Sequence, residues 1–160
     1  MKDKPLAELT LRKYEKPFRL SGRELVRKLC LSLGLLQPAD SRDVVVDVLY
    51  SLLRSESLTA KELEEMVKAT REQHNLPITG AAPSNIRRQV KRLKDAMLVD
   101  NVGRTYRIAE DAALHEVFTE RIEKFYLPAI VSRVKEYCEA VENERWKRGT
   151  KLSKVQKPDE

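Results

Sequence analysis

The sequence predicts a mostly helical α+β protein with one small β-hairpin, and three observations support this prediction. Apolar residues recur at spacings of three and four over most of the chain, which is the helical period. Residues that favour helix starts stand before several of these stretches. Near residue 100, two short runs flank a turn that contains a glycine, which is typical of a hairpin.

The first helix is expected to begin at Ser21. Ser21 and Glu24 have the spacing of a capping box, an apolar stripe follows, and Gly34 supplies a stop. The residues before Ser21 favour neither a helix nor a strand. A second helix is expected to begin near Asp40 or Ser41, either of which can act as its cap. The three valines that follow would also suit a strand, but the longer pattern keeps the helical period and favours a helix.

A short strand and a third helix are expected next. Leu58 is an isolated apolar residue that suits a short strand, and Thr59 with Glu62 has the spacing of another capping box. The apolar pattern carries this helix to about Gln73. A loop with two prolines and a glycine follows, and the Pro-Ser pair at 83–84 opens the fourth helix, since proline suits a first turn.

The last part of the chain is expected to hold a hairpin and a long helix. Residues 98–99 are predicted to begin one strand, residues 101–104 to form the turn, and residues 105–108 to form the second strand. From residue 110 to about residue 148 the pattern is helical again. Pro128 interrupts it, so either the helix kinks there or a second helix starts with Pro128 in its first turn.

Several classes of function lack their signals in this sequence. Cys30 and Cys138 are far apart, with no second ligand at metal spacing, which argues against a zinc site and a disulfide framework. His74 and His115 have no carboxylate or cysteine at a useful spacing, and there is no phosphate-binding glycine loop and no nucleophile motif. We therefore expect no enzymatic activity and no cofactor.

Positive charge gathers in separate blocks of the chain. Residues 84–107 carry seven basic and two acidic groups, and residues 1–28 carry nine and four. By contrast, residues 29–83 and 108–144 are net acidic. Such clustering is expected of a protein with a polyanionic partner. No apolar run approaches membrane length and the start is not a signal peptide, so we expect a cytoplasmic protein, nucleoid-associated if prokaryotic.

The order of the expected elements resembles the winged helix-turn-helix superfamily. The stretches LTAKELEEMV and APSNIRRQVKRLKDAMLVDNVGRTYRIA carry this resemblance, which covers about residues 42–109. Residues 84–96 match the recognition helix, and residues 98–108 match the wing. The sequence departs from the usual pattern in the long loop 73–82, in Met97 where many members have glycine, and in a short wing turn.

The resemblance, together with the pattern and composition of the flanking residues, predicts four segments. Residues 1–40 form an N-terminal extension with one helix, and residues 41–109 form the winged helix-turn-helix domain. Residues 110–148 form a long helical segment for dimerisation or packing, and residues 149–160 form a basic, disordered tail.

The resemblance also implies that the outward face of the 84–96 helix contacts DNA. The residues expected at base edges are Ser84, Arg88 and Lys91. The residues expected at phosphates are Asn85, Arg87, Arg92, Lys94, Arg104 and Arg107. Asp95, the one acid on the outward face, lies at the C-terminal end, away from the half of the helix that usually contacts bases.

The long C-terminal segment has too much apolar surface to stay exposed. It either folds back on the first helices or pairs with a second copy, and we favour a homodimer, because a twofold protein reads two half-sites. The residues expected at the dimer contact are Leu114, Phe118, Ile122, Phe125, Ile130, Val134, Tyr137 and Val141.

These observations predict a dimeric protein that binds double-stranded DNA, as a transcriptional regulator or a chromatin-associated factor. The alternative is a winged-helix adaptor that binds other proteins in a transcription, replication or segregation assembly. Its active surface would be the acidic face of residues 108–144 or the N-terminal helix. RNA binding is a weaker option, because no aromatic residues interleave the basic helix. The sequence indicates neither a small-molecule effector nor a target DNA sequence.

Overall fold

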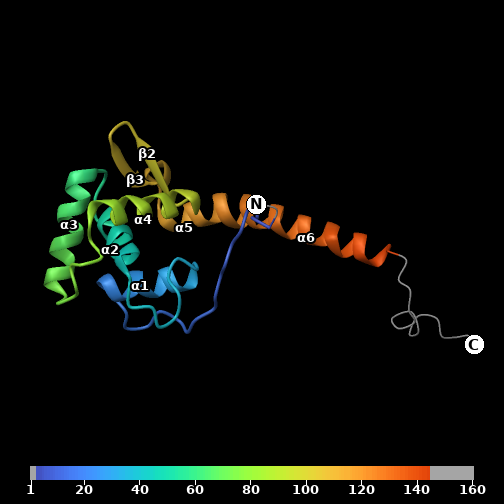
Figure 1. Ribbon diagram of the computed structural model, residues 1–160, viewed down its shortest axis with the longest axis horizontal. Helices are drawn as coiled ribbons and strands as arrows, with labels where there is room; N and C mark the ends of the chain where they lie inside the picture. The colour runs from blue at the N-terminus through green and yellow to red at the C-terminus, as the bar shows by residue number, and fades with distance from the viewer. Residues whose placement is uncertain (1–2, 145–160) are drawn as a thin grey trace, which may run out of the picture.

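The computed structural model describes residues 3–144 and shows a mostly helical α+β fold with a small three-stranded antiparallel sheet (Figure 1). The predicted mostly helical α+β class and the predicted long C-terminal helix are confirmed. Residues 3–20 contain neither a helix nor a strand before α1 begins. The predicted tail, residues 149–160, and the expected helix end near residue 148 lie outside the described residues.

Helix α2 (Val44–Leu53) forms the centre of the body, with α1 (Gly22–Ser32), α3 (Ala60–Gln73) and α4 (Pro83–Asp95) packed against it. A helix that is apolar around its whole circumference is stable only when it is buried on all sides. The buried residues of α2 are Val44, Val45, Val46, Asp47, Val48, Leu49, Ser51 and Leu52. The three valines therefore form a helix, as predicted, because neighbouring helices cover them.

One of the two predicted capping boxes is confirmed and the other is wrong. At the start of α3, the Thr59 side chain accepts a hydrogen bond from the Glu62 N–H, and the Glu62 carboxylate accepts one from the Thr59 N–H. Ser21 makes no such bond, and Gly22 takes a left-handed φ of 57° where the chain enters α1.

The predicted start of α2 also needs a correction. The cap position is Asp43 rather than Asp40 or Ser41, and no side chain caps it with a hydrogen bond. Asp40 instead accepts a hydrogen bond from the N–H of Arg42, which forms a local turn ahead of the helix. The Asp43 carboxylate is occupied by arginines on two other helices, so it is not available as a cap.

The sheet has the order β1-β3-β2, with antiparallel pairing throughout. Strands β2 (Val99–Val102) and β3 (Thr105–Ile108) form the predicted hairpin, but Asn101 and Val102, expected in the turn, pair with β3 as part of β2. The short strand β1 (Leu58–Thr59) adds to the edge of β3. Met97 takes a left-handed φ of 69° at the end of α4, and the Leu98 N–H bonds to the Leu93 carbonyl at 3.0 Å. Met97 thus adopts the backbone that glycine usually supplies at a helix stop.

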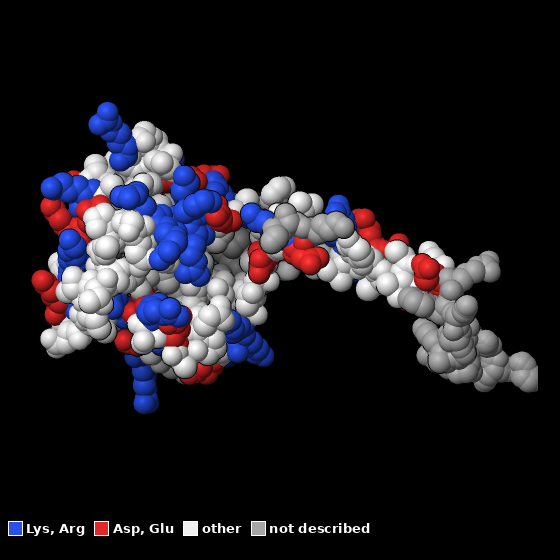
Figure 2. All heavy atoms as spheres, viewed as in Figure 1, with Lys and Arg blue, Asp and Glu red and all other residues white. Residues whose placement is uncertain are grey.

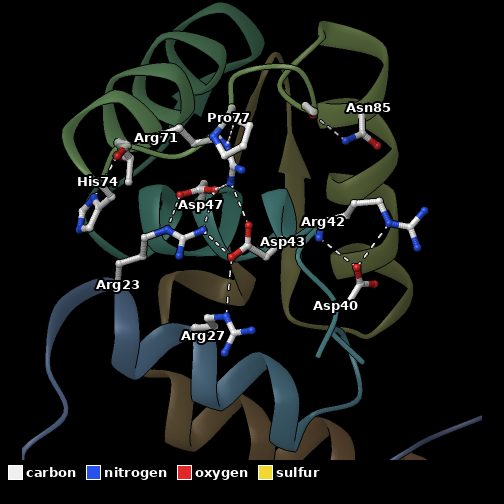
Figure 3. A network of polar contacts seen from close by, with 12 residues as sticks. Arg23, Arg27, Asp40, Arg42, Asp43, Asp47, Arg71, His74, Pro77 and Asn85 are labelled. Atoms are coloured by element: carbon white, nitrogen blue, oxygen red, sulfur yellow. Dashed lines mark hydrogen bonds and ion pairs between the residues drawn. The ribbon is translucent and has the colours of Figure 1, made fainter. Parts of the chain in front are cut away.

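A buried cluster of two arginines and two aspartates joins three helices (Figure 3). Arg23 of α1 contacts Asp47 at 2.7 Å and Asp43 at 3.0 Å. Arg71 of α3 contacts Asp47 at 2.6 Å and Asp43 at 3.0 Å. Burial raises the pKa of Asp43, but hydrogen bonds from Arg71 and Arg23 outweigh it and hold that pKa below its usual value. We refer to these four residues as the buried ion cluster.

The C-terminal part is one continuous helix made of α5 (Leu114–Val117), the π-helical segment η2 (Phe118–Tyr126) and α6 (Leu127–Glu142). Pro128 lies in the first turn of α6, as one of the two alternatives predicted, yet the backbone stays helical across the junction. The first half packs on the body, whereas α6 projects away from it (Figure 1). Within residues 3–144, no helix combines the length and hydropathy needed to cross a bilayer.

Replacing Arg71 with alanine should destabilise the fold strongly. Arg71→Ala leaves the buried Asp47 with only Arg23 as ion-pair partner and Asp43 with Arg23 and the more distant Arg27, and breaking a buried ion pair on one side costs about 3–5 kcal/mol. Urea unfolding followed by circular dichroism measures this loss. Lys68→Ala, which removes an exposed cation from the same helix, should change the free energy of unfolding by less than about 0.5 kcal/mol. Equal losses for the two variants would contradict the role of the cluster.

Candidate nucleic-acid interface

Helix α4 turns an apolar side to the core and a basic side to solvent. Ile86, Val90 and Leu93 are buried, and Pro83 occupies the first turn, as predicted for the proline. Lys and Arg side chains gather at the centre of the face shown in Figure 2, where α4 runs in Figure 1. The helix therefore presents positive charge to solvent, and the packing of its apolar side against the core fixes its orientation.

The long loop before α4 is anchored at two points. The Arg71 guanidinium donates a hydrogen bond to the Pro77 carbonyl at 2.6 Å, and the Asn85 amide donates one to the Gly80 carbonyl at 2.7 Å (Figure 3). Gly80 also lies so close to α2 that a Cβ atom there would come within 3.0 Å of Val44. These contacts fix the start of α4 although the loop is longer than is usual between such helices.

Asn85 also holds the first basic side chain of the helix. Its side-chain oxygen accepts hydrogen bonds from Arg88 at 2.6 Å and from Gln89 at 3.0 Å. Asn85 is half-buried, whereas Arg88 is exposed. Asn85, predicted as a phosphate contact, therefore orients Arg88 and the loop within its own chain.

Two other predicted phosphate contacts are also engaged within the protein. Arg92 donates to the Leu35 carbonyl at 2.6 Å and to the Gln89 side chain at 2.8 Å, which ties α4 to the turn after α1. Arg107 is half-buried in β3, and its Nε atom is buried without a hydrogen-bond partner among the described residues. Their positive charge still adds to the local field, but their side chains are less free to reach a ligand.

The remaining predicted residues lie at the surface. Ser84, Arg87, Arg88, Lys91, Lys94 and Arg104 are exposed. Lys91 pairs with Asp95 at 3.1 Å, but both side chains are mostly exposed, and such pairs stabilise a fold by only about 0–1 kcal/mol. Lys91 is therefore free to exchange this carboxylate for another anion. Arg104 follows Gly103 in the turn of the hairpin, where Gly103 has a φ of 61°.

Arg42 is a further basic residue at this surface, and the sequence analysis missed it. Its side chain is 91% exposed, and it contacts Asp40 at 3.3 Å. Hydrogen bonds from Arg42 lower the pKa of Asp40, and the charge of Arg92 contributes too, so this pair lies beside α4. Arg42 lies in residues 29–83, which are net acidic, so the net charge of that block gave no sign of a basic residue at this surface.

Residues 3–144 hold no group of three or more His, Cys, Asp or Glu side chains that could bind a metal ion. No protein-family model matches the sequence, and neither the curated proteins nor the solved structures include a match. The surface of α4 and its chemistry are thus the basis for a functional hypothesis.

Arg92 and Arg87 should differ in their effect on stability, although both are arginines of α4. Arg92→Ala removes a hydrogen bond to a backbone carbonyl and one to Gln89, which should cost about 1–3 kcal/mol. Arg87→Ala removes an exposed side chain and should change stability by less than about 0.5 kcal/mol. Thermal and urea unfolding test this difference. A larger loss for Arg87→Ala would show that the two roles have been assigned the wrong way round.

Proposed function

We propose that this protein binds double-stranded DNA, with α4 as the recognition helix and the β2–β3 hairpin as the wing of a winged helix-turn-helix domain. The observation that carries the proposal is the exposed basic face of α4, on which Asp95 is the one acid. The element order from α2 to β3 and the sheet order β1-β3-β2 support it, because they match the pattern of that superfamily. DNA phosphates are the dense negative charge that such a face attracts.

The exposed residues suggest separate roles on the duplex. Ser84 and Arg88 lie in the N-terminal half of α4 and Lys91 lies just past its middle, and these three residues suit base edges in the major groove. Arg87, Lys94 and Arg104 suit phosphates, which position a protein without reading sequence. Asn85 and Arg92 then act indirectly, because they hold Arg88 and α4 in place.

We further propose that the protein acts as a homodimer, joined through the C-terminal helix. Leu114, Phe118 and Ile122, three of the predicted dimer contacts, instead pack against the body of their own chain. The contact would then use the residues further along, which are the half-buried Ile130 and the exposed Phe125, Val134, Tyr137 and Val141. A dimeric transcriptional regulator or chromatin-associated factor, cytoplasmic and on the nucleoid if prokaryotic, is the role that fits best, rather than an enzyme.

Duplex binding measured over a range of salt concentrations tests the DNA proposal. Arg87→Ala with Lys94→Ala should lower the slope of log affinity against log salt by about two per chain, because each phosphate contact contributes about 0.9. Arg88→Ala with Lys91→Ala should weaken binding about tenfold or more, as expected when base contacts are lost. Fluorescence anisotropy with a labelled duplex gives both quantities.

Lys13→Ala with Lys16→Ala is the matched control, since it removes the same charge from exposed positions of the N-terminal segment. This pair should leave the slope nearly unchanged. If the wild-type protein shows no duplex affinity even at low salt, the DNA proposal fails and the adaptor alternative takes its place. If all three double variants behave alike, the positive charge acts without regard to position and the assigned face is wrong.

A further inference from the structure

The charge of α6 and the residues just after it changes sign along the helix. Residues 127–135 contain two basic groups, Arg133 and Lys135, and no acid. Residues 136–144 contain four acids and no base. The acids are Glu136, Glu139, Glu142 and Glu144. The C-terminal helix thus has a basic half followed by an acidic half.

The same helix carries an apolar row at helical spacing. Ile130, Val134 and Tyr137 follow one another at intervals of four and three, with Val131 beside them. Val134 is 56% exposed and Tyr137 is 69% exposed, and no residue of α6 is buried. A row of this kind is expected to pack against another surface.

We infer that two copies of the chain pair through α6 in antiparallel orientation, with Val134 of one copy opposite Tyr137 of the other. This inference rests on the proposed homodimer and specifies its geometry. An antiparallel pair sets the basic half of each helix beside the acidic half of the other. A parallel pair would set the four glutamates beside four glutamates and the bases beside bases, which is repulsive.

The position of the body supports the same orientation. Phe118 packs against the core and Ile122 is buried in it, and the Tyr126 hydroxyl accepts a hydrogen bond from the Glu8 N–H of the N-terminal segment. The start of α6 therefore lies against its own chain. In a parallel pair, the N-terminal ends of the two α6 helices, each of which lies against its own chain, would be brought together. In an antiparallel pair, the two bodies lie at opposite ends of the α6 pair. A helix of 16 residues gives that pair a length of about 24 Å.

Disulfide trapping between chains with one exposed cysteine each distinguishes the two orientations. Ile130→Cys and Val141→Cys are each made together with Cys138→Ser, and Cys30 stays, because burial raises the pKa of its thiol to about 12. In the antiparallel pair, residue 130 of one copy faces residue 141 of the other. Neither variant alone should then form a covalent dimer on mild oxidation, but their mixture, after exchange of subunits, should do so.

The possible outcomes separate this inference from the proposed dimer. Covalent dimers of either variant alone would show a parallel pair and overturn the inference. Light scattering that gives a dimer without any cross-link in the mixture would overturn the stated pairing of residues. Light scattering that gives one chain mass at micromolar concentration would overturn the dimer itself, while the duplex-binding measurements would still test the α4 face.

Charge reversal provides a second, independent readout. Arg133→Glu with Lys135→Glu should raise the dissociation constant of the wild-type dimer about tenfold, because these residues would then face glutamates of the other copy. Adding Glu139→Lys and Glu142→Lys should restore most of the affinity. In a parallel pair the first change replaces one like-charge contact with another and should have little effect. Analytical ultracentrifugation of the full chain measures each constant, and an unchanged value would contradict the antiparallel arrangement.

Discussion

The buried ion cluster is the interaction on which the rest of the structure depends. Its two aspartates are Asp47 of α2 and Asp43 at the cap position of α2, and its two arginines come from α1 and α3, so it fixes three helices around one centre. Two negative and two positive groups balance each other, which is what makes charge tolerable in a core. The same Arg71 also bonds to the Pro77 carbonyl in the loop that leads into α4. The position of α4 is therefore linked to the cluster through one side chain.

The basic residues of this protein have different roles, which are distinguished by the burial of each side chain and by the groups it contacts. Arg23 and Arg71 lie in the core and hold helices together. Arg92 ties α4 to the turn after α1 through the Leu35 carbonyl. Arg88 and Lys94 are exposed on α4, where they are free to contact a ligand. The net charge of +6 thus combines two groups of residues. Some arginines stabilise the fold, whereas the exposed basic residues of α4 form a surface that suits a polyanion.

Much of the fold could be predicted from the sequence, because periodicity and capping residues act locally. The Thr59–Glu62 box, the proline at the start of α4 and the hairpin with Gly103 are short-range features. The ion cluster could not be predicted in this way, since its paired members lie 20 to 28 residues apart in the sequence. One signal was available, because Asp47 stands in an otherwise apolar run and an acid there needs a partner.

The candidate site was predicted only in outline, for a related reason. The helical period indicates which way a side chain points, but not which atoms of the folded chain it contacts. Arg92 and Arg88 both point outward by that measure, yet Arg92 finds a backbone carbonyl 57 residues away in the sequence. In the same way, Ile122 and Val134 share the apolar pattern of the C-terminal helix, but only Ile122 is covered by the body.

Lysine acetylation footprinting tests the central claim, that the α4 face binds DNA, most directly. Lys91 and Lys94 lie on that face, whereas Lys61 and Lys68 are exposed on α3. With a saturating duplex at low salt, the account predicts that Lys91 and Lys94 become protected while Lys61 and Lys68 react as before. Full reactivity of Lys91 and Lys94 with the duplex bound would contradict it.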